Sequence, residues 1–257
     1  MMYGARVDRH DEDILSGFMA DASRRGFLVM LEAVIFDFDG VLVESVDVKT
    51  KAFAKLFEGY GTDVVRKVVD FHLANGGMTR YDKFRYYYSE VLREPLSEAK
   101  MQELSDHFSQ LVVEQVIAAP YVAGAREFLD RHSGTLDLFV VSATPEEEIR
   151  YIVARRGMQG YFKGVYGAPR TKLGLTRGVL EENGYRPEGV LFVGDATSDF
   201  EAARDTGCAF VGRVARDQSS PFPGGTLVTQ DLTGLGEMVA DLMQRSGRPS
   251  GKGDSRR

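Results

Sequence analysis

The segment FDFDGVLVES, residues 36–45, decides the fold, because it joins a buried strand to a pair of acidic residues. It continues a short apolar run, Ala33–Phe36, of the kind found in parallel strands that are covered on both faces. Asp37 and Asp39 are alternate residues of an extended segment, so both point to the same side at the end of the strand. Two carboxylates this close repel each other unless a cation lies between them or one is protonated. Taken alone, the pair is also compatible with a solvated turn at Gly40.

Four further apolar runs follow this strand and are separated by helical patterns. The apolar runs cover residues 136–141, 165–166, 190–193 and 209–211. The helical patterns between them cover residues 146–157, 172–183 and 198–206. Short buried strands that alternate with helices predict an α/β fold with a doubly wound parallel sheet.

One interval, residues 44–119, interrupts the alternation because it contains helical patterns only. Apolar residues recur there with the 3.6-residue period of amphipathic helices. The predicted helices cover residues 45–58, 62–74, 79–92 and 97–118. A block of this kind, inserted directly after the first strand, predicts a separate helical domain. It is expected over the carboxyl edge of the sheet, where open α/β sheets bind their ligands.

The composition is that of an ordinary globular protein. The chain has 257 residues, of which 43% are hydrophobic and 27% are charged, and its formal net charge is −6. This charge gives no reason to expect a nucleic acid as partner, and no apolar stretch is long enough to span a bilayer. The single cysteine excludes an intramolecular disulfide and a cysteine-built zinc site. We expect a cytoplasmic monomer or homodimer, although the cysteine count is also compatible with a bacterial periplasm.

The two ends of the chain differ from its body. Residues 1–29 show no sustained period and precede Met30, which predicts an N-terminal extension that is disordered or belongs to a mis-assigned start. Residues 246–257 are rich in glycine, serine and arginine, which predicts a disordered tail. The predicted organisation is an α/β core from residues 30–43 and 120–245, with the helical block 44–119 inserted.

Polar residues also follow the other predicted strands. Asp195 follows one strand, and Asp199 lies four residues further on at the start of a helix. Ser142 follows a second strand, and Lys172 begins the helix after a third. Taken singly, these residues are compatible with a helix-end charge, a helix cap and a solvated lysine. Because parallel strands end at one edge of a sheet, together they predict one site.

The side chains of this predicted site share a common chemistry. Carboxylate oxygens without histidine or cysteine ligands select Mg²⁺. A divalent cation, a lysine and the amino end of a helix converge on an oxyanion, most simply a phosphate. In this interpretation Asp37 is a nucleophile at phosphorus, and Asp39 is a general acid that later becomes a base.

Four segments resemble the four motifs of the haloacid dehalogenase-like superfamily, in the usual order and spacing. They are FDFDGVLVES, VVSATP, GAPRTK and FVGDATSDFEAA, and the resemblance covers about residues 31–215. It implies a Rossmann-like three-layer core with a parallel sheet. It also implies an inserted all-helical cap, as in phosphoglycolate phosphatases and β-phosphoglucomutases.

The same resemblance implies a role for each residue of the site. Asp37 becomes an aspartyl-phosphate, and Asp39 is the general acid and base whose backbone carbonyl binds Mg²⁺. Ser142 and the N–H of Ala143 hold the transferring phosphoryl group, which Lys172 bridges to the nucleophile. The implied metal-binding residues are Asp37, Asp39, Asp195 and Asp199.

The residue at position 39 separates the branches of this superfamily. Dehalogenases and phosphonatases resemble the chain but lack this second acid, whereas Asp39 predicts an oxygen leaving group and hence a phosphate ester. We expect a Mg²⁺-dependent phosphatase acting on a small phosphorylated metabolite, a sugar phosphate or a phosphoglycolate-like acid. A β-phosphoglucomutase-like phosphosugar mutase is the alternative enzyme, although Lys49 stands where such mutases usually carry a histidine. A catalytically idle binding relative is the non-enzymatic alternative, which the complete acidic set argues against.

Substrate choice is expected to depend on the inserted helical block. Residues 74–80 connect two of its predicted helices, and Gly76 and Gly77 permit a close approach of the backbone. Arg80 is predicted to meet a carboxylate or hydroxyl of the substrate, and Lys49, Lys83 and Arg85 are further candidates for substrate binding. A solvent-facing turn with a solvated arginine is the alternative for this segment.

Overall fold

A computed structural model of the chain describes residues 31–216 and 218–239. The predicted N-terminal extension and tail lie outside the described residues. Within them, six strands form one parallel sheet in the order β3-β2-β1-β4-β5-β6, which is the order of a Rossmann-like fold. The strands are β1 (Ala33–Phe36), β2 (Asp137–Pro145), β3 (Gly164–Ala168), β4 (Val190–Gly194), β5 (Ala209–Arg213) and β6 (Val228–Thr229).

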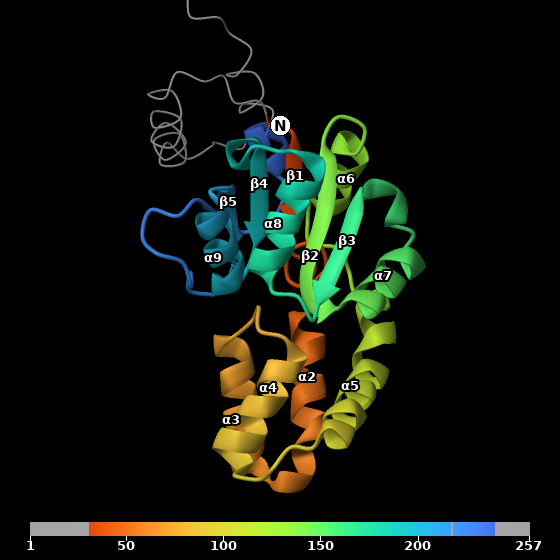
Figure 1. Cartoon of the computed structure of the whole chain (residues 1–257), viewed down its shortest axis with the longest axis vertical. Coiled ribbons are helices and arrows are strands. Elements are labelled where there is room, and N and C mark those ends of the chain that lie inside the picture. The colour runs from red at the N-terminus through yellow and green to blue at the C-terminus, as the bar shows by residue number, and fades with distance from the viewer. Residues whose placement is uncertain (1–30, 217, 240–257) are drawn as a thin grey trace, which may run out of the picture.

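Helices cover both faces of the sheet, so the core has three layers (Figure 1). The covering helices are α6 (Ala125–His132) and α7 (Glu146–Arg155) on one face, and α8 (Lys172–Asn183) and α9 (Thr197–Thr206) on the other. Val34 and Phe36 of β1 pack with the first pair of helices. Ala33 and Ile35 pack with the second pair. Alternate strand residues point to opposite faces, so a continuous apolar run serves both layers, and the predicted fold class is confirmed.

The three central strands are in register at the point where β1 ends. Phe36 of β1 pairs with Val140 of β2 and with Val193 of β4. The N–H of Asp37 continues this ladder and donates to the carbonyl of Val193 at 2.9 Å. The residues that follow these paired positions are therefore brought to the same edge of the sheet.

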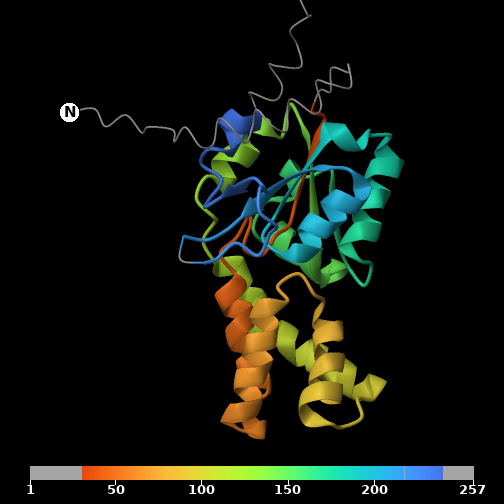
Figure 2. The same cartoon turned by 90° about the vertical axis from the view of Figure 1, so that its left-hand side faces the viewer.

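A second group of helices, the helical lobe (residues 46–118), is inserted between β1 and α6 and lies beyond this edge (Figures 1 and 2). Its elements are α2 (Val46–Leu56), α3 (Thr62–Ala74), α4 (Arg80–Tyr86), a π-helical turn (Tyr87–Leu92) and α5 (Glu98–Ala118). Aromatic rings fill its centre, and the ring of Phe53 lies 4.4 Å from that of Phe108. Neither these helices nor any other in the described part is long and apolar enough to cross a membrane. The predicted domain boundaries stay predictions.

Side-chain caps fix the starts of three helices. Thr79, Ser97 and Thr171 precede α4, α5 and α8, and the hydroxyl of each accepts the backbone N–H of the residue three positions later, at 3.1–3.2 Å. Each bond satisfies a donor that the first helical turn leaves unpaired. The caps at Thr79 and Ser97 agree with the sequence-based helix starts.

Some elements differ from the sequence-based expectation. The predicted helix 79–92 changes at Tyr87 from α-helical to π-helical, where the buried Tyr87 hydroxyl donates to the carbonyl of Val68 at 3.2 Å. Strand β2 runs on to Pro145 instead of ending at residue 141. The sequence patterns indicated neither α6 nor β6, because eight and two residues are too few to establish a period.

The two chain connections of the helical lobe lie against each other. The N–H of Glu44 donates to the carbonyl of Pro120 at 3.0 Å, and the N–H of Val122 donates to the carbonyl of Leu42 at 3.1 Å. The chain therefore leaves the core and returns to it at one point.

Candidate active site

Asp37 lies at the end of β1 with 5% of its surface exposed. Its Oδ1 accepts the N–H of Phe38 at 2.7 Å, and its Oδ2 accepts the ammonium of Lys172 at 2.9 Å. These bonds hold the carboxylate in one orientation at the sheet edge. A carboxylate fixed in this way can meet an electrophile with little further loss of conformational freedom.

Lys172, the first residue of α8, is buried between two carboxylates. Its Nζ donates to Asp37 at 2.9 Å and to Asp199 at 2.5 Å. Burial disfavours the ammonium, but the charges of Asp199 and Asp37 outweigh it and raise the pKa of Lys172 above its ordinary value. This pairing explains a cation at the amino end of a helix, where the helix dipole alone disfavours it.

Asp195 and Asp199 flank the turn from β4 into α9. The Oδ2 of Asp199 accepts the N–H of Ala196 at 3.1 Å, so this carboxylate caps the start of the helix. One oxygen each from Asp37, Asp195 and Asp199 lie within 4.8 Å of one another. The structure thus brings these three predicted metal-binding residues together.

The three carboxylates carry more negative charge than one lysine balances. Burial, together with the charges of Asp37 and Asp199, raises the pKa of Asp195 well above its ordinary value. Burial also raises the pKa of Asp199 to about 6, against the opposing charge of Lys172. A divalent cation among these oxygens would offset the repulsion, and a set of oxygen donors is what Mg²⁺ prefers. The residues present therefore fit a magnesium ion.

Asp39 is held by three side chains from two parts of the chain. Its carboxylate forms an ion pair with Lys49 and accepts the hydroxyl of Ser45 at 2.6 Å and that of Thr144 at 3.2 Å. Burial alone would raise the pKa of Asp39, but the charge of Lys49 and the three hydrogen bonds together lower it below its ordinary value. Asp39 is therefore ionised in this arrangement. Neither Ser45 nor Thr144 was predicted from the sequence to contact Asp39, although both lie inside the quoted motifs.

Ser142 and Ala143 lie where β2 leaves its neighbour. The register between β2 and β3 shifts between Val141 and Pro145, so the residues between them are released from regular pairing. The Ser142 hydroxyl is buried and accepts the N–H of Thr144 at 3.1 Å. Helix α7 begins directly afterwards, so this segment combines a hydroxyl with the amino end of a helix, a favourable place for an anion.

The loop after β1 is shaped by Gly40 and Arg213. Gly40 has a φ of +74°, and a Cβ there would lie 2.2 Å from an Oδ of Asp195, so only glycine fits. Arg213, at the end of β5, donates to the carbonyl of Gly40 at 3.1 Å, forms an ion pair with Glu44 at 2.7 Å and donates to the carbonyl of Gln230 at 3.0 Å. Arg213 was not predicted from the sequence, although a charged residue two positions after the apolar run 209–211 was an available signal.

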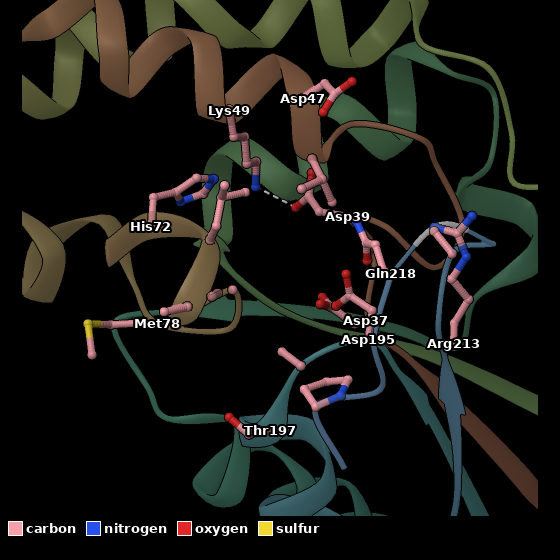
Figure 3. A pocket seen from close by; sticks show the side chains of 18 of the residues that line it. Asp37, Asp39, Asp47, Lys49, His72, Met78, Asp195, Thr197, Arg213 and Gln218 are labelled. Carbon is pink, nitrogen blue, oxygen red and sulfur yellow. Dashed lines mark hydrogen bonds and ion pairs between the residues drawn. The ribbon is translucent and has the colours of Figure 1, made fainter. Parts of the chain in front are cut away.

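One cavity of about 590 Å³ between the core and the helical lobe is lined by several of these residues: Asp37, Asp39, Ser142, Asp195 and Arg213. Figure 3 shows Asp37 and Asp195 on the core side of the cavity, with Lys49 and His72 on the lobe side. Lys49 reaches across the cavity to Asp39 and also donates to Thr144 at 2.8 Å. A cavity of this size suits a small molecule.

Arg80, a predicted substrate-binding residue, also lines this cavity but is already bonded to protein groups. Only 5% of its surface is exposed, and its guanidinium forms a two-pronged ion pair with Glu148 of α7. It also donates to Ser109 at 2.7 Å and lies over the ring of Phe108 at 4.6 Å. The guanidinium therefore links α4 and α5 to the core, and a contact with substrate stays a prediction.

The connection between α3 and α4 touches the core through Gly77. A Cβ at Gly77 would lie 1.8 Å from the Ser198 hydroxyl, 3.0 Å from the Ser198 Cβ and 3.1 Å from the Ala196 Cβ. A Cβ at the neighbouring Gly76 would meet only the Ala196 Cβ, at an ordinary 3.6 Å. The close approach of this loop to the core therefore requires glycine at position 77 but not at position 76.

We expect Gly77→Ala to hold the loop away from the core and to lower kcat/KM for a phosphate ester by about tenfold. Gly76→Ala is the matched control and should stay within about twofold of the parent. Ser198→Gly, added to Gly77→Ala, should restore part of the loss, since it removes two of the three crowded contacts. Equal rates for the two alanine variants would show that this contact does not matter for turnover.

Comparisons with known proteins agree with this geometry. A model of the family described as haloacid dehalogenase-like hydrolase matches residues 34–213. The chain is 26% identical over 182 residues to a phosphoglycolate phosphatase from Synechococcus elongatus, covering 69% of this chain and 81% of that protein. It is 27% identical over 186 residues to a phosphorylated carbohydrates phosphatase from Thermotoga maritima, covering 69% of this chain and 82% of that protein.

Solved structures show the same fold. The crystal structure of β-phosphoglucomutase from Clostridium difficile superposes with a TM-score of 0.69 at 18% identity. The match covers 84% of this chain and 98% of that chain. At this identity the likeness concerns the fold alone.

Proposed function

Because the chain belongs to the haloacid dehalogenase-like hydrolase family, we propose that it is a Mg²⁺-dependent phosphatase. Its substrate is the phosphate monoester of a small metabolite, a sugar phosphate or a phosphoglycolate-like acid. The observation that carries the proposal is Asp37, fixed by Phe38 and Lys172 and facing a cavity that Asp39 also lines. The relatives named phosphatases support the same reaction class.

Asp37, Asp195 and Asp199 would hold the magnesium ion, together with the backbone carbonyl of Asp39. When bound, the ion balances the carboxylates and offsets the negative charge of the phosphoryl group. Lys172 keeps its positive charge beside Asp37, so it also offsets the negative charge of the phosphoryl oxygens. With their charge balanced, the carboxylates no longer repel a phosphate dianion.

In the first step a carboxylate oxygen of Asp37 attacks phosphorus and forms an aspartyl-phosphate, while the bond from phosphorus to the ester oxygen breaks. The leaving oxygen takes a proton from Asp39. The Ser142 hydroxyl and the N–H of Ala143 donate to the phosphoryl oxygens during the transfer. In the second step Asp39 takes a proton from water, the water oxygen attacks phosphorus, and phosphate leaves as Asp37 regains its carboxylate.

The ion pair between Lys49 and Asp39 keeps Asp39 ionised and so favours its role as the base of the second step. An ionised Asp39 accepts a proton from water in the second step but has none to give in the first. Asp39 must therefore take up a proton and loosen its bond to Lys49 when the ester binds. Lys49 thus regulates which of its two roles Asp39 is ready to perform.

We expect Asp39→Asn to separate the two steps. Steady-state hydrolysis of an alkyl phosphate should fall by about two orders of magnitude or more, because neither the acid nor the base remains. With 4-nitrophenyl phosphate, whose leaving group needs no proton, a single burst of nitrophenolate should persist while later turnovers stop. Rapid-quench kinetics measures the burst, and a variant that turns over both esters like the parent contradicts the role of Asp39.

The function itself is tested with a panel of phosphorylated metabolites. The purified protein with Mg²⁺ should release phosphate from 4-nitrophenyl phosphate and, faster, from at least one sugar phosphate or phosphorylated hydroxy acid. Complete inactivity on every ester would leave only a binding role and would overturn the proposal.

A further inference from the structure

The helical lobe supplies three cationic side chains to the cavity, and two of them are already paired. Lys49 pairs with Asp39, and Arg80 pairs with Glu148. The third, Lys83 of α4, is 2% exposed and forms no ion pair with any carboxylate of the described residues. A buried ammonium without an anion is costly, so Lys83 requires a reason beyond stability.

Lys83 is seated against His72 and has hydrogen-bonding capacity left over. Its Nζ lies 2.8 Å from Nδ1 of His72, a second acceptor is the His72 carbonyl at the limiting distance of 3.5 Å, and the ring of Phe53 lies 5.5 Å away. An ammonium has three protons, so these acceptors leave at least one proton for another group. Lys83 lines the same cavity as Asp37.

His72 also has an unused donor. Burial and the charge of Lys83 lower its pKa to about 3, so the ring is neutral. Because Nδ1 accepts from Lys83, the single ring proton is on Nε2, and Nε2 is buried without a hydrogen-bond partner among the described residues. His72 is 5% exposed and lines the cavity on the lobe side, as Figure 3 shows. The spare proton of Lys83 and the unpartnered Nε2 proton of His72 lie on adjacent buried side chains and form a built site for an acceptor from outside.

The surroundings of Lys83 favour an anion over a neutral group. Burial and the charges of Lys49 and Lys172 together lower the pKa of Lys83 to about 7, and the charges of Asp195 and Asp39 oppose this only in part. A bound anion would supply the negative charge that the protein itself does not place beside Lys83. The charged and titratable groups around Lys83 are Lys49 of α2, His72 of α3, Arg80 of α4 with its partner Glu148 of α7, and Asp39, Lys172 and Asp195 of the core.

We propose that Lys83 and His72 bind a second anionic group of the substrate, on the side of the leaving group. This inference rests on the proposed phosphatase function and names its substrate class, an ester whose alcohol carries a carboxylate or another phosphate. Lys83 supplies the charge, His72 positions it and adds a neutral donor, and Phe53 and Phe108 form apolar walls beside them. An uncharged alcohol leaves both donors unsatisfied and is selected against.

The test compares esters that differ in this group alone. The first pair is 2-phosphoglycolate and 2-hydroxyethyl phosphate, and the second pair is propane-1,3-diol bisphosphate and its monophosphate. The charged member of at least one pair should have the higher kcat/KM, by about tenfold or more, and the pair that shows the preference tells whether the group is a carboxylate or a phosphate. Hydrolysis of all four esters without a preference would overturn the inference but not the phosphatase, whereas no hydrolysis at all would overturn the proposed function.

Variants assign the preference to Lys83 and His72. Lys83→Met should lower kcat/KM for the charged ester of a pair more than for the neutral one, so that the preference is lost. His72→Asn, which keeps an acceptor near the position of Nδ1, should retain more of the preference than His72→Leu. Lys67→Met, which removes an exposed lysine of α3, is the matched control and should have no effect. A preference that survives Lys83→Met, or an equal loss on both members of a pair, contradicts the proposal.

The pH dependence of the parent enzyme gives a test that needs no variant. The ratio of kcat/KM for 2-phosphoglycolate to that for 2-hydroxyethyl phosphate should be highest near pH 6 and fall above about pH 7, as free Lys83 loses its proton. The ionisation of groups that act on the reacting phosphate changes kcat/KM for both esters equally, so it cancels in this ratio. A ratio that stays flat from pH 6 to pH 9 overturns the assignment to Lys83.

Discussion

Replacing Asp37 by asparagine is expected to lower kcat by about three orders of magnitude or more, on every ester that the parent hydrolyses. An amide oxygen is a poor nucleophile, so no aspartyl-phosphate forms, while the amide can still accept the N–H of Phe38. The measurement is phosphate release together with acid-quenched trapping of labelled phosphoryl enzyme, which should be found with the parent and not with the variant.

Asp47 provides the control for this experiment. It also lines the cavity but is exposed and takes no part in the proposed chemistry, so Asp47→Asn should keep kcat within about twofold of the parent. Thermal unfolding of both variants checks that the fold is retained. Turnover of Asp37→Asn near that of the parent would exclude the covalent mechanism.

Removal of divalent cations is the second change expected to abolish turnover. After exhaustive chelation, Asp37, Asp195 and Asp199 are left with Lys172 as their one cationic partner among the described residues, and they repel a phosphate dianion. Activity should fall by about three orders of magnitude and return on titration with Mg²⁺. Ca²⁺ should not restore it, since its larger coordination shell permits Asp37 to bind it through both oxygens and lose its attacking geometry.

The same metal should be detectable without turnover. Mg²⁺ that binds the folded chain raises the midpoint of thermal unfolding, and this rise should be much smaller for Asp195→Asn, which removes one of the three clustered carboxylates. Full activity after chelation, or a midpoint that Mg²⁺ does not change, would contradict a magnesium site at these carboxylates.

The sequence predicted those parts of the molecule that follow from local pattern. Alternating apolar runs and helical periods predicted the parallel sheet, and the residues after each run predicted the edge where Asp37, Ser142 and Asp195 meet. The prediction was possible because the carboxyl ends of parallel strands lie at the same edge of a sheet, so residues that follow different strands come close together in space.

The contacts between distant helices could not be predicted in the same way. Arg80 was singled out as a free cation of a loop, but Glu148, 68 positions later, pairs with it, and nothing local to either residue indicates the other. The contact between Lys83 and His72 depends likewise on how α3 and α4 lie against each other. The π-helical turn at Tyr87 arises inside a regular apolar pattern, because tertiary packing and not the local period decides it.

The paired connections of the helical lobe have a consequence for how this architecture can change. The carbonyl of Pro120 lies 3.0 Å from the N–H of Glu44, so the core presents the same closely spaced pair of chain ends whatever is placed between them. An insertion at such a point adds loop-closure entropy that grows only slowly with its length, and it does not disturb the register of the sheet. We therefore expect that the helical lobe can be shortened, enlarged or replaced by recombination while the sheet and the carboxylates at its edge are inherited unchanged.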